Sequence, residues 1–110
     1  MKTGPGRATR DARREADARE DMELVERFKR GDGAAFEELV SRYEGKLYNM
    51  GRRMCGHDED AKEMLQETFL AAYRGLKDFR GDSKFSVWLF KVAKNFCIKM
   101  RRKSVYAPEE

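Results

Sequence analysis

Proline is nearly absent from this chain of 110 residues, where it occurs only at positions 5 and 108. Nothing between those two positions is forced to break a helix. No apolar run approaches the roughly 20 residues of a membrane-spanning helix. The first 20 residues also lack the apolar centre of a signal peptide. We therefore expect a cytoplasmic protein with no membrane insertion.

Cysteine and histidine are equally scarce. Cys55 and Cys97 do not make a disulfide framework, and in a reducing compartment they should be free thiols. The one histidine, His57, follows Cys55 and Gly56, which together with one remote cysteine is a weak zinc pattern. No paired nucleophile and base, phosphate-binding glycine loop or cofactor fingerprint is present. The sequence thus argues against an enzyme and predicts no cofactor and no metal.

Charge is abundant, at 40% of the residues, but it is unevenly distributed. Residues 57–67, HDEDAKEMLQE, carry five acids against one lysine. Residues 83–108 carry no acid, and their cations are Lys84, Lys91, Lys94, Lys99, Arg101, Arg102 and Lys103. Surfaces of opposite sign suggest two different partners.

Apolar residues recur at helical spacing through most of the chain. Helices are expected over residues 22–30, 34–54, 58–74 and 84–103. The charged residues 1–20 are expected to form a flexible tail whose end can be helical. Residues 21–104 then form one domain, and residues 105–110 begin a linker. Without any period-two strand pattern, we predict an all-α fold, a compact bundle of about four helices.

Aromatic and basic side chains alternate through the last predicted helix and the loop before it. Cations neutralise phosphates and aromatic planes hold unstacked bases, so this composition is typical of a single-strand nucleic-acid surface. Gly81 allows a backbone to approach a ligand closely. Alternatively Phe85, Trp88 and Phe96 are core residues, because their spacing also fits a buried stripe. We expect rings that pack mostly inward and lysines that face solvent.

Three motifs in order resemble conserved region two of a bacterial sigma factor, closest to the extracytoplasmic-function (ECF) group. They are DAKEMLQETF at 60–69, FRGDSKF at 79–85 and WLFKVAKN at 88–95. Residues 24–54 also resemble the opening helices of that family, so the resemblance spans about residues 22–103. It implies a sigma-70 family region 2 domain, a helical transcription initiation factor without catalytic activity.

The resemblance implies a polymerase contact for the acidic segment. In this family the corresponding helix docks on the clamp helices, a coiled coil of the largest core subunit of RNA polymerase. By position, Glu63, Gln66 and Glu67 would make the contact, with Asp60 and Leu65 beside them. Spacings of three and four place the first three on one helical face. Lys62 departs from the family pattern, which usually has an acid there.

The resemblance also implies a promoter contact. In the family, the loop and following helix capture the non-template strand of the minus-ten element and hold a flipped base. By position, the pocket would be built by Phe79, Arg80, Gly81, Asp82 and Ser83. Lys84, Lys91, Lys94 and Asn95 would line the strand, and Trp88 would support the helix from within. Lys99, Arg101, Arg102 and Lys103 would add phosphate contacts.

Other expectations follow from the same resemblance. Sigma factors of this group carry a second domain, region 4, whose helix-turn-helix reads the minus-thirty-five element. No such pattern follows here, so we expect an excised first domain, and a monomer. Many members are also held by an anti-sigma factor. Two alternatives stay open: a general single-stranded nucleic-acid-binding domain, and a thiol or metal sensor that uses Cys55, Cys97 or His57.

Overall fold

Four α-helices make up the fold in the computed structural model, which describes the backbone of residues 5–106 and the side chains of residues 10–102. They are α1 (Pro5–Lys29), α2 (Gly33–Cys55), α3 (Asp58–Gly75) and α4 (Phe85–Tyr106), with a short 3-10 helix, η1 (Leu76–Asp78). The predicted all-α bundle of about four helices is confirmed. Within the described range, every helix is too short or too polar to cross a membrane.

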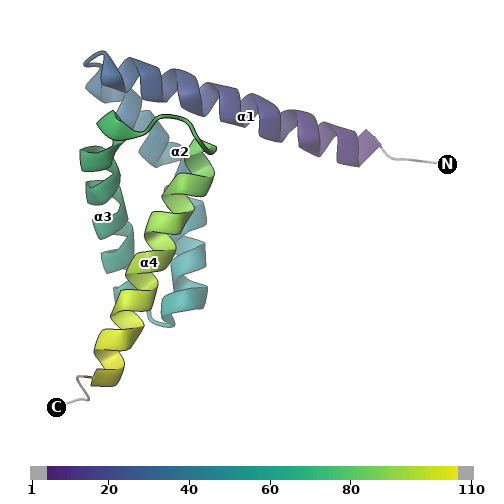
Figure 1. Cartoon of the computed structure of the whole chain (residues 1–110). Helices are drawn as coiled ribbons and strands as arrows, with labels where there is room; N and C mark the ends of the chain where they lie inside the picture. The colour runs from purple at the N-terminus through teal and green to yellow at the C-terminus, as the bar shows by residue number, and fades with distance from the viewer. Residues whose placement is uncertain (1–4, 107–110) are drawn as a thin grey trace.

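The body of the bundle is formed by α2, α3 and α4, which all pack on one another. Helix α1 lies across one end of this body, next to the loop between η1 and α4 (Figure 1). Its C-terminal part contacts α2, α4 and η1, whereas its N-terminal part extends past the body into solvent. The fold therefore consists of three packed helices and one helix laid across their end.

The ends of α2 follow from local chemistry. Asp32 is the N-cap, and its Oδ1 accepts a hydrogen bond of 3.1 Å from the backbone N–H of Ala34. At the other end Gly56 adopts the left-handed conformation, with φ of 87°, and its N–H donates to the carbonyl of Arg52. The helix therefore ends at Cys55, one residue beyond its predicted end at 54.

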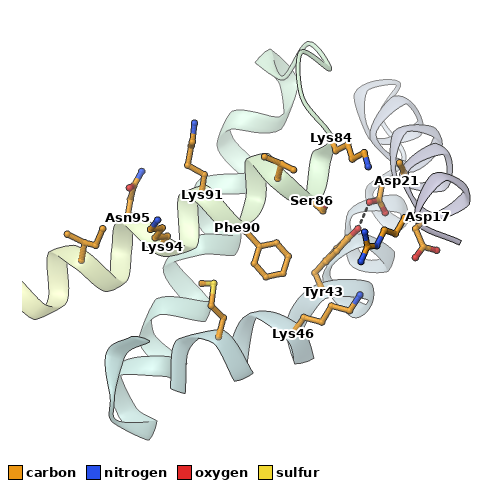
Figure 2. A pocket seen from close by; sticks show the side chains of 15 residues that line it. Asp17, Asp21, Tyr43, Lys46, Lys84, Ser86, Phe90, Lys91, Lys94 and Asn95 are labelled. Atoms are coloured by element: carbon orange, nitrogen blue, oxygen red, sulfur yellow. Dashed lines mark hydrogen bonds between the residues drawn. The ribbon is translucent and has the colours of Figure 1, made fainter. Parts of the chain in front are cut away.

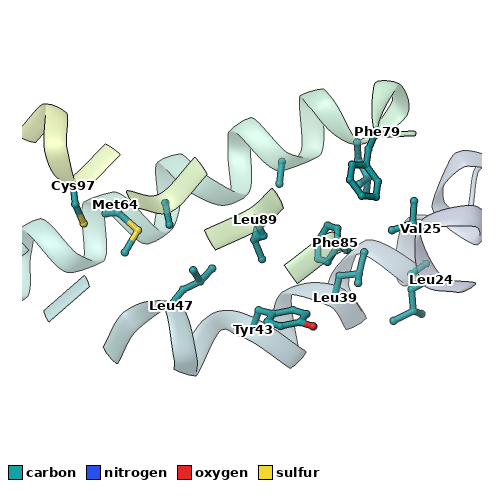
Figure 3. Packing of buried hydrophobic residues seen from close by; sticks show 14 of the residues in the cluster. Leu24, Val25, Leu39, Tyr43, Leu47, Met64, Phe79, Phe85, Leu89 and Cys97 are labelled. Carbon is teal, nitrogen blue, oxygen red and sulfur yellow. The ribbon is translucent and has the colours of Figure 1, made fainter. Parts of the chain in front are cut away.

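One hydrophobic core runs along the inside of the bundle (Figure 3). The body helices fill it with fully buried side chains, among them Leu39, Leu47, Met64, Leu89 and Cys97. Helix α1 contributes Leu24 and Val25. Between residues 10 and 20 no side chain is buried. The core thus anchors only the C-terminal part of α1.

Helix occupies more of the expected flexible tail than its end, since α1 begins at Pro5. Proline suits the first turn of a helix, and the alanine, arginine and glutamate that follow are good helix formers. The segment therefore continues the helix that the core anchors. At the other end, α4 includes residues 105 and 106 of the expected linker. Residues 1–4 and 107–110 lie outside the described residues.

A buried carboxylate fastens α1 to α2. Asp21 is only 1% exposed and accepts hydrogen bonds from the Tyr43 hydroxyl and from Arg42 Nε, the latter at 2.8 Å (Figure 2). Arg42 also pairs with Glu20 at 2.9 Å and with Asp17 at 3.6 Å. Burial raises the pKa of Asp21, and the bonds from Tyr43 and Arg42 oppose that rise. Burial and the bond to Asp21 raise the pKa of Tyr43, so its hydroxyl stays a donor.

Gly51 lies where α2 comes closest to α3. A Cβ atom at this position would lie 2.5 Å from Met64 Cε and 3.2 Å from Ala61 Cβ. Both neighbours are fully buried, so neither has free space to move into. The absence of a side chain at position 51 therefore permits the packing of these two helices.

Gly51→Val should lower the free energy of unfolding by about 2 kcal/mol, because overpacking a core typically costs about 1–3 kcal/mol. Gly45→Ala is the matched control in the same helix, since a Cβ atom there meets nothing within 4 Å. The control should raise stability by up to about 1 kcal/mol through helix propensity. Urea unfolding followed by circular dichroism measures both variants. Wild-type stability in Gly51→Val would contradict a close α2–α3 contact.

Tyr43→Phe should lower the free energy of unfolding at neutral pH by about 1–3 kcal/mol, because it leaves buried Asp21 short of one donor. The ordinary pKa of that carboxyl is 3.8, its folded pKa is already raised, and the substitution raises it further. A carboxyl with a raised folded pKa favours folding most when protonated. The deficit should therefore shrink as the pH falls toward 3.8 and be largest above the folded pKa.

Tyr48→Phe is the control for this prediction. The Tyr48 hydroxyl donates to Asp58, whose side chain is 41% exposed, so water can replace the lost donor. Urea unfolding at acidic and neutral pH compares the two variants. A deficit in Tyr43→Phe that is the same at both pH values would contradict the assigned role of Asp21.

Candidate functional site

Helix α4 divides its residues between the core and a cationic face. Phe85, Leu89, Ala93 and Cys97, spaced four apart, are buried. The cations between and beyond them are all exposed, namely Lys91, Lys94, Lys99, Arg101 and Arg102. Trp88 is half-buried against the core, as the sequence suggested. The expectation that the rings turn inward and the lysines outward is therefore confirmed.

A groove of about 890 Å³ runs between α1, α2 and α4 (Figure 2). Apolar side chains line it, including Tyr43, Phe90, Val87 and Ile98, of which the last two are exposed. The other lining residues include four predicted strand contacts, Lys84, Lys91, Lys94 and Asn95, together with Lys46 and Arg14. The structure thus brings these four predicted residues together at one concave surface that is both apolar and cationic.

The loop from Phe79 to Lys84 leads into the groove. Arg80, Gly81, Asp82 and Ser83 are exposed, and Gly81 takes the left-handed conformation with φ of 82°. A residue without a Cβ atom adopts that conformation without strain. The backbone and polar side chains of the loop are therefore accessible to a ligand.

Phe79 differs from the other four predicted pocket residues. It is only 6% exposed, and its ring lies 5.2 Å from that of Trp88 and 6.2 Å from that of Phe85, measured between centroids. Its ring belongs to the core beneath the loop, so Phe79 could contribute to a pocket only from below. Its position in the motif could not reveal this, since an aromatic residue suits either environment.

Helix α1 supports the same loop through contacts that the sequence did not predict. Lys29 Nζ donates a hydrogen bond to the carbonyl oxygen of Phe79, 50 positions away. A Cβ atom at Gly81 would lie 3.5 Å from Met22 Cε. The sequence offered no signal for these pairs, because isolated contacts between distant positions leave no periodic pattern.

The last cations of α4 lie apart from the loop. Lys99, Arg101 and Arg102 are exposed at the opposite end of the helix (Figure 1). With a rise of 1.5 Å per residue, the backbone of Arg102 is about 27 Å from that of Lys84. A ligand that meets both must therefore follow the helix axis. The side chain of Lys103 lies outside the described residues.

The acidic face of α3 consists of Glu63, Gln66 and Glu67, which are exposed at spacings of three and four. Leu70 shares this face, three positions after Glu67, and is 45% exposed. Leu70 does not fit the apolar spacing that packs α3 against the core. This departure could have identified it as an exposed apolar residue from the sequence. Leu65, predicted to lie beside the acids, is half-buried and packs against the core.

Asp60 and Lys62 precede this face in the first turns of α3. Asp60 is half-buried near the start of the helix. Lys62, which departs from the family pattern, pairs with Asp58 at 3.3 Å. The lysine is therefore paired within its own helix, with an acid one turn before it.

The two thiols pack in the core, and the histidine lies on the surface. Cys97 is fully buried, and burial with a hydrogen bond to Cys55 raises its pKa to about 12. A thiol with so high a pKa is a poor nucleophile and metal ligand. His57 is exposed before α3, and within residues 10–102 no cluster of three possible metal ligands occurs. These environments favour packing over a sensor role.

Comparison with known proteins connects this geometry to a family. The family model described as Sigma-70 region 2 matches residues 39–105. The RNA polymerase sigma-H factor of Pseudomonas aeruginosa is 43% identical over 76 residues, which are 69% of this chain and 39% of that protein. The ECF RNA polymerase sigma-E factor of Escherichia coli is 44% identical over 75 residues, 68% of this chain and 39% of that protein. The chain thus spans about two fifths of the length of these relatives.

A solved structure agrees with the sequence relatives. It is an engineered region 2 of sigmaE, determined by NMR in complex with GTAAAA. The two folds superpose with a TM-score of 0.73 at 36% identity, over 82% of this chain and 94% of that chain. The predicted resemblance is confirmed by both comparisons. The chain belongs to the sigma-70 region 2 family, with ECF sigma factors among its relatives.

Proposed function

We propose that this domain acts in transcription initiation by binding, without catalysis. In this proposal α3 binds the clamp helices of RNA polymerase, and α4 with its preceding loop binds the minus-ten element of a promoter. The observation that carries the proposal is the groove, where Lys84, Lys91, Lys94 and Asn95 surround an apolar floor. A related domain of the same fold was solved in complex with GTAAAA, which supports a single strand as the ligand.

The groove matches the chemistry of a single strand. Lysines neutralise phosphates, and apolar or aromatic side chains such as Phe90 and Val87 receive unstacked bases. The amide of Asn95 can donate to and accept from a base edge. A duplex hides its base faces, so this surface favours the opened strand.

Melting follows from this preference. A protein that binds the open strand better than the duplex shifts the equilibrium toward the open form. Flipping one base costs a few kcal/mol, and stacking offsets about 1–3 kcal/mol per base. In the proposal, the exposed residues Arg80–Ser83 hold the flipped base, and buried Phe79 supports the loop from below.

Lys91→Glu/Lys94→Glu should weaken binding to the single strand GTAAAA by about tenfold or more and lower the salt slope by about 1.4, since each phosphate contact on a single strand contributes about 0.7. The control is Arg53→Glu/Arg74→Glu, which reverses two exposed cations outside the groove. Fluorescence anisotropy over a salt series measures both. Equal losses in the two variants would show that net charge, and not this groove, binds the strand.

The face of α3 fits a basic helical partner. Glu63 and Glu67 offer carboxylates that pair with lysine or arginine, and Gln66 can both donate and accept hydrogen bonds. Leu70 adds an exposed apolar contact on the same face. An apolar residue surrounded by polar ones is the usual anatomy of a protein interface. In the proposal Leu70 therefore joins the polymerase contact.

Glu63→Lys/Glu67→Lys should abolish binding to a clamp-helix fragment of the polymerase, because it places cations against a basic partner. The control is Glu37→Lys/Glu44→Lys on α2, where both acids are exposed. Titration calorimetry measures the affinity, and binding of GTAAAA should stay unchanged in every variant. A folded wild-type domain that binds the strand but not the fragment would instead support a general single-strand binder.

The proposed partners also suggest how the domain would be controlled. An anti-sigma factor that covers the acidic face of α3 or the groove would block one of the two contacts. In this proposal the domain works in the cell interior, where the polymerase meets the promoter.

A further inference from the structure

The N-terminal part of α1 forms an arm that extends past the bundle (Figure 1). We use this name for residues 10–15, all of which are exposed. Short isolated helices are only marginally stable in water. The core does not stabilise the arm. Any function of the arm must therefore come from its exposed, charged side chains.

The charges of the arm are sorted by helical face. Arg14 lines the groove and so fixes which face of α1 is turned toward it. Arg10 lies one turn earlier on that face, and Arg13 is three positions from Arg10. At about 100° per residue, Arg10 lies about 40° from Arg14, and Arg13 lies on the far side of Arg10. The acids Asp11 and Glu15 lie about 100° and 140° from Arg10 on the other side. Arg10 is therefore the centre of a cationic stripe whose edge, Arg14, meets the groove.

These arginines are available to a partner. Among the described residues, Arg10, Arg13 and Arg14 form no ion pair, whereas Asp17 and Glu20 on the same helix are paired with Arg42. The bond between Asp21 and Arg42 sets the direction of α1 at the base of the arm. Where α1 is helical, its axis therefore carries the arginines in a set direction from the groove.

We propose that Arg10, Arg13 and Arg14 extend the nucleic-acid interface beyond the groove and bind phosphates of nucleotides that adjoin the minus-ten element. The inference rests on the proposed function of the groove. Arg14 joins the two surfaces, since it lines the groove together with Lys84, Lys91 and Lys94. From Arg10 to Arg14 the helix rises about 6 Å. That distance is close to two nucleotide steps of roughly 3.4 Å each in a duplex strand.

Arginine has properties that phosphate binding uses and that solubility alone does not require. Its guanidinium group binds phosphate oxygens in a bidentate manner and stays charged at every physiological pH. Such contacts read no base, so they would add affinity without changing sequence preference. The arm would therefore strengthen binding to any promoter with the right minus-ten element.

The experiment compares strands of different length with the full chain. The probes are GTAAAA and the same strand lengthened by a thymidine tract at its 5′ or its 3′ end, measured by fluorescence anisotropy. Wild type should bind one of the lengthened strands more tightly than GTAAAA. Arg10→Glu/Arg13→Glu should remove that advantage and leave the affinity for GTAAAA unchanged, because neither residue lines the groove.

Salt dependence gives the expected size of the effect. Two phosphate contacts contribute a slope of about 1.4, so the wild-type advantage should fall about sevenfold between roughly 50 and 200 mM salt. Arg19→Glu/Arg30→Glu is the matched control, since both arginines are exposed, follow the arm in the chain and do not line the groove. Arg10→Gln/Arg13→Gln removes charge while keeping helix propensity, and circular dichroism checks that the helix persists.

Each outcome decides the question. Equal binding of all three strands, or an unchanged advantage in Arg10→Glu/Arg13→Glu, would overturn the arm's role. Failure of wild type to bind even GTAAAA would overturn the proposed function on which the inference rests. If Arg10→Glu/Arg13→Glu kept the advantage for the lengthened strand but lost binding to polymerase core, the phosphate contact would be overturned. The arm would then be assigned to an acidic protein surface.

Discussion

The groove depends on the hydrogen bonds that buried Asp21 accepts from two donors on α2. Taking a carboxylate out of water is costly unless hydrogen bonds satisfy it, and here Arg42 and Tyr43 do so. These bonds fix where α1 crosses the end of the body. Only with α1 in that place does the groove have a third wall, and only then does Lys29 reach the carbonyl of Phe79.

The second constraint is that one helix serves two purposes. Helix α4 supplies the core with every fourth side chain and presents lysines between them. Because no acid occurs between Ser83 and Pro108, the exposed side keeps a positive potential along its whole length. Helix α3 instead presents Glu63 and Glu67 on one exposed face. A small bundle can in this way offer two partners of opposite charge without a deep cavity.

The sequence predicted the body helices well because each carries an apolar stripe at helical spacing. Leu39, Leu47 and Leu89 follow from that pattern directly. The first turns of α1 carry no apolar stripe, and its residues 10–20 bury no side chain, so no pattern marked this part of the helix. The motifs identified the family but did not state which side of each helix faces outward. They could not show, for example, that the ring of Phe79 packs beneath the loop while Arg80–Ser83 are exposed.

Contacts between distant positions were beyond prediction for a different reason. The pairs Asp21–Tyr43 and Lys29–Phe79 join single residues on separate elements, and no repeat or spacing marks them. The groove also depends on contacts between distant positions, because its walls come from three helices. The predicted strand contacts Lys84, Lys91, Lys94 and Asn95 could be found by motif, but their shared cavity with Lys46 and Arg14 could not.

The loop before α4 has one more consequence. Buried aromatic rings hold both of its ends, Phe79 before it and Phe85 after it, while residues 80–84 between them are exposed. The fold thus depends on the two anchors and, apart from Gly81 with its φ of 82°, little on what lies between. The exposed positions 80 and 82–84 behave as an interchangeable cassette: their side chains can change while the scaffold stays the same. The surface chemistry of this loop can therefore diverge at small cost to folding.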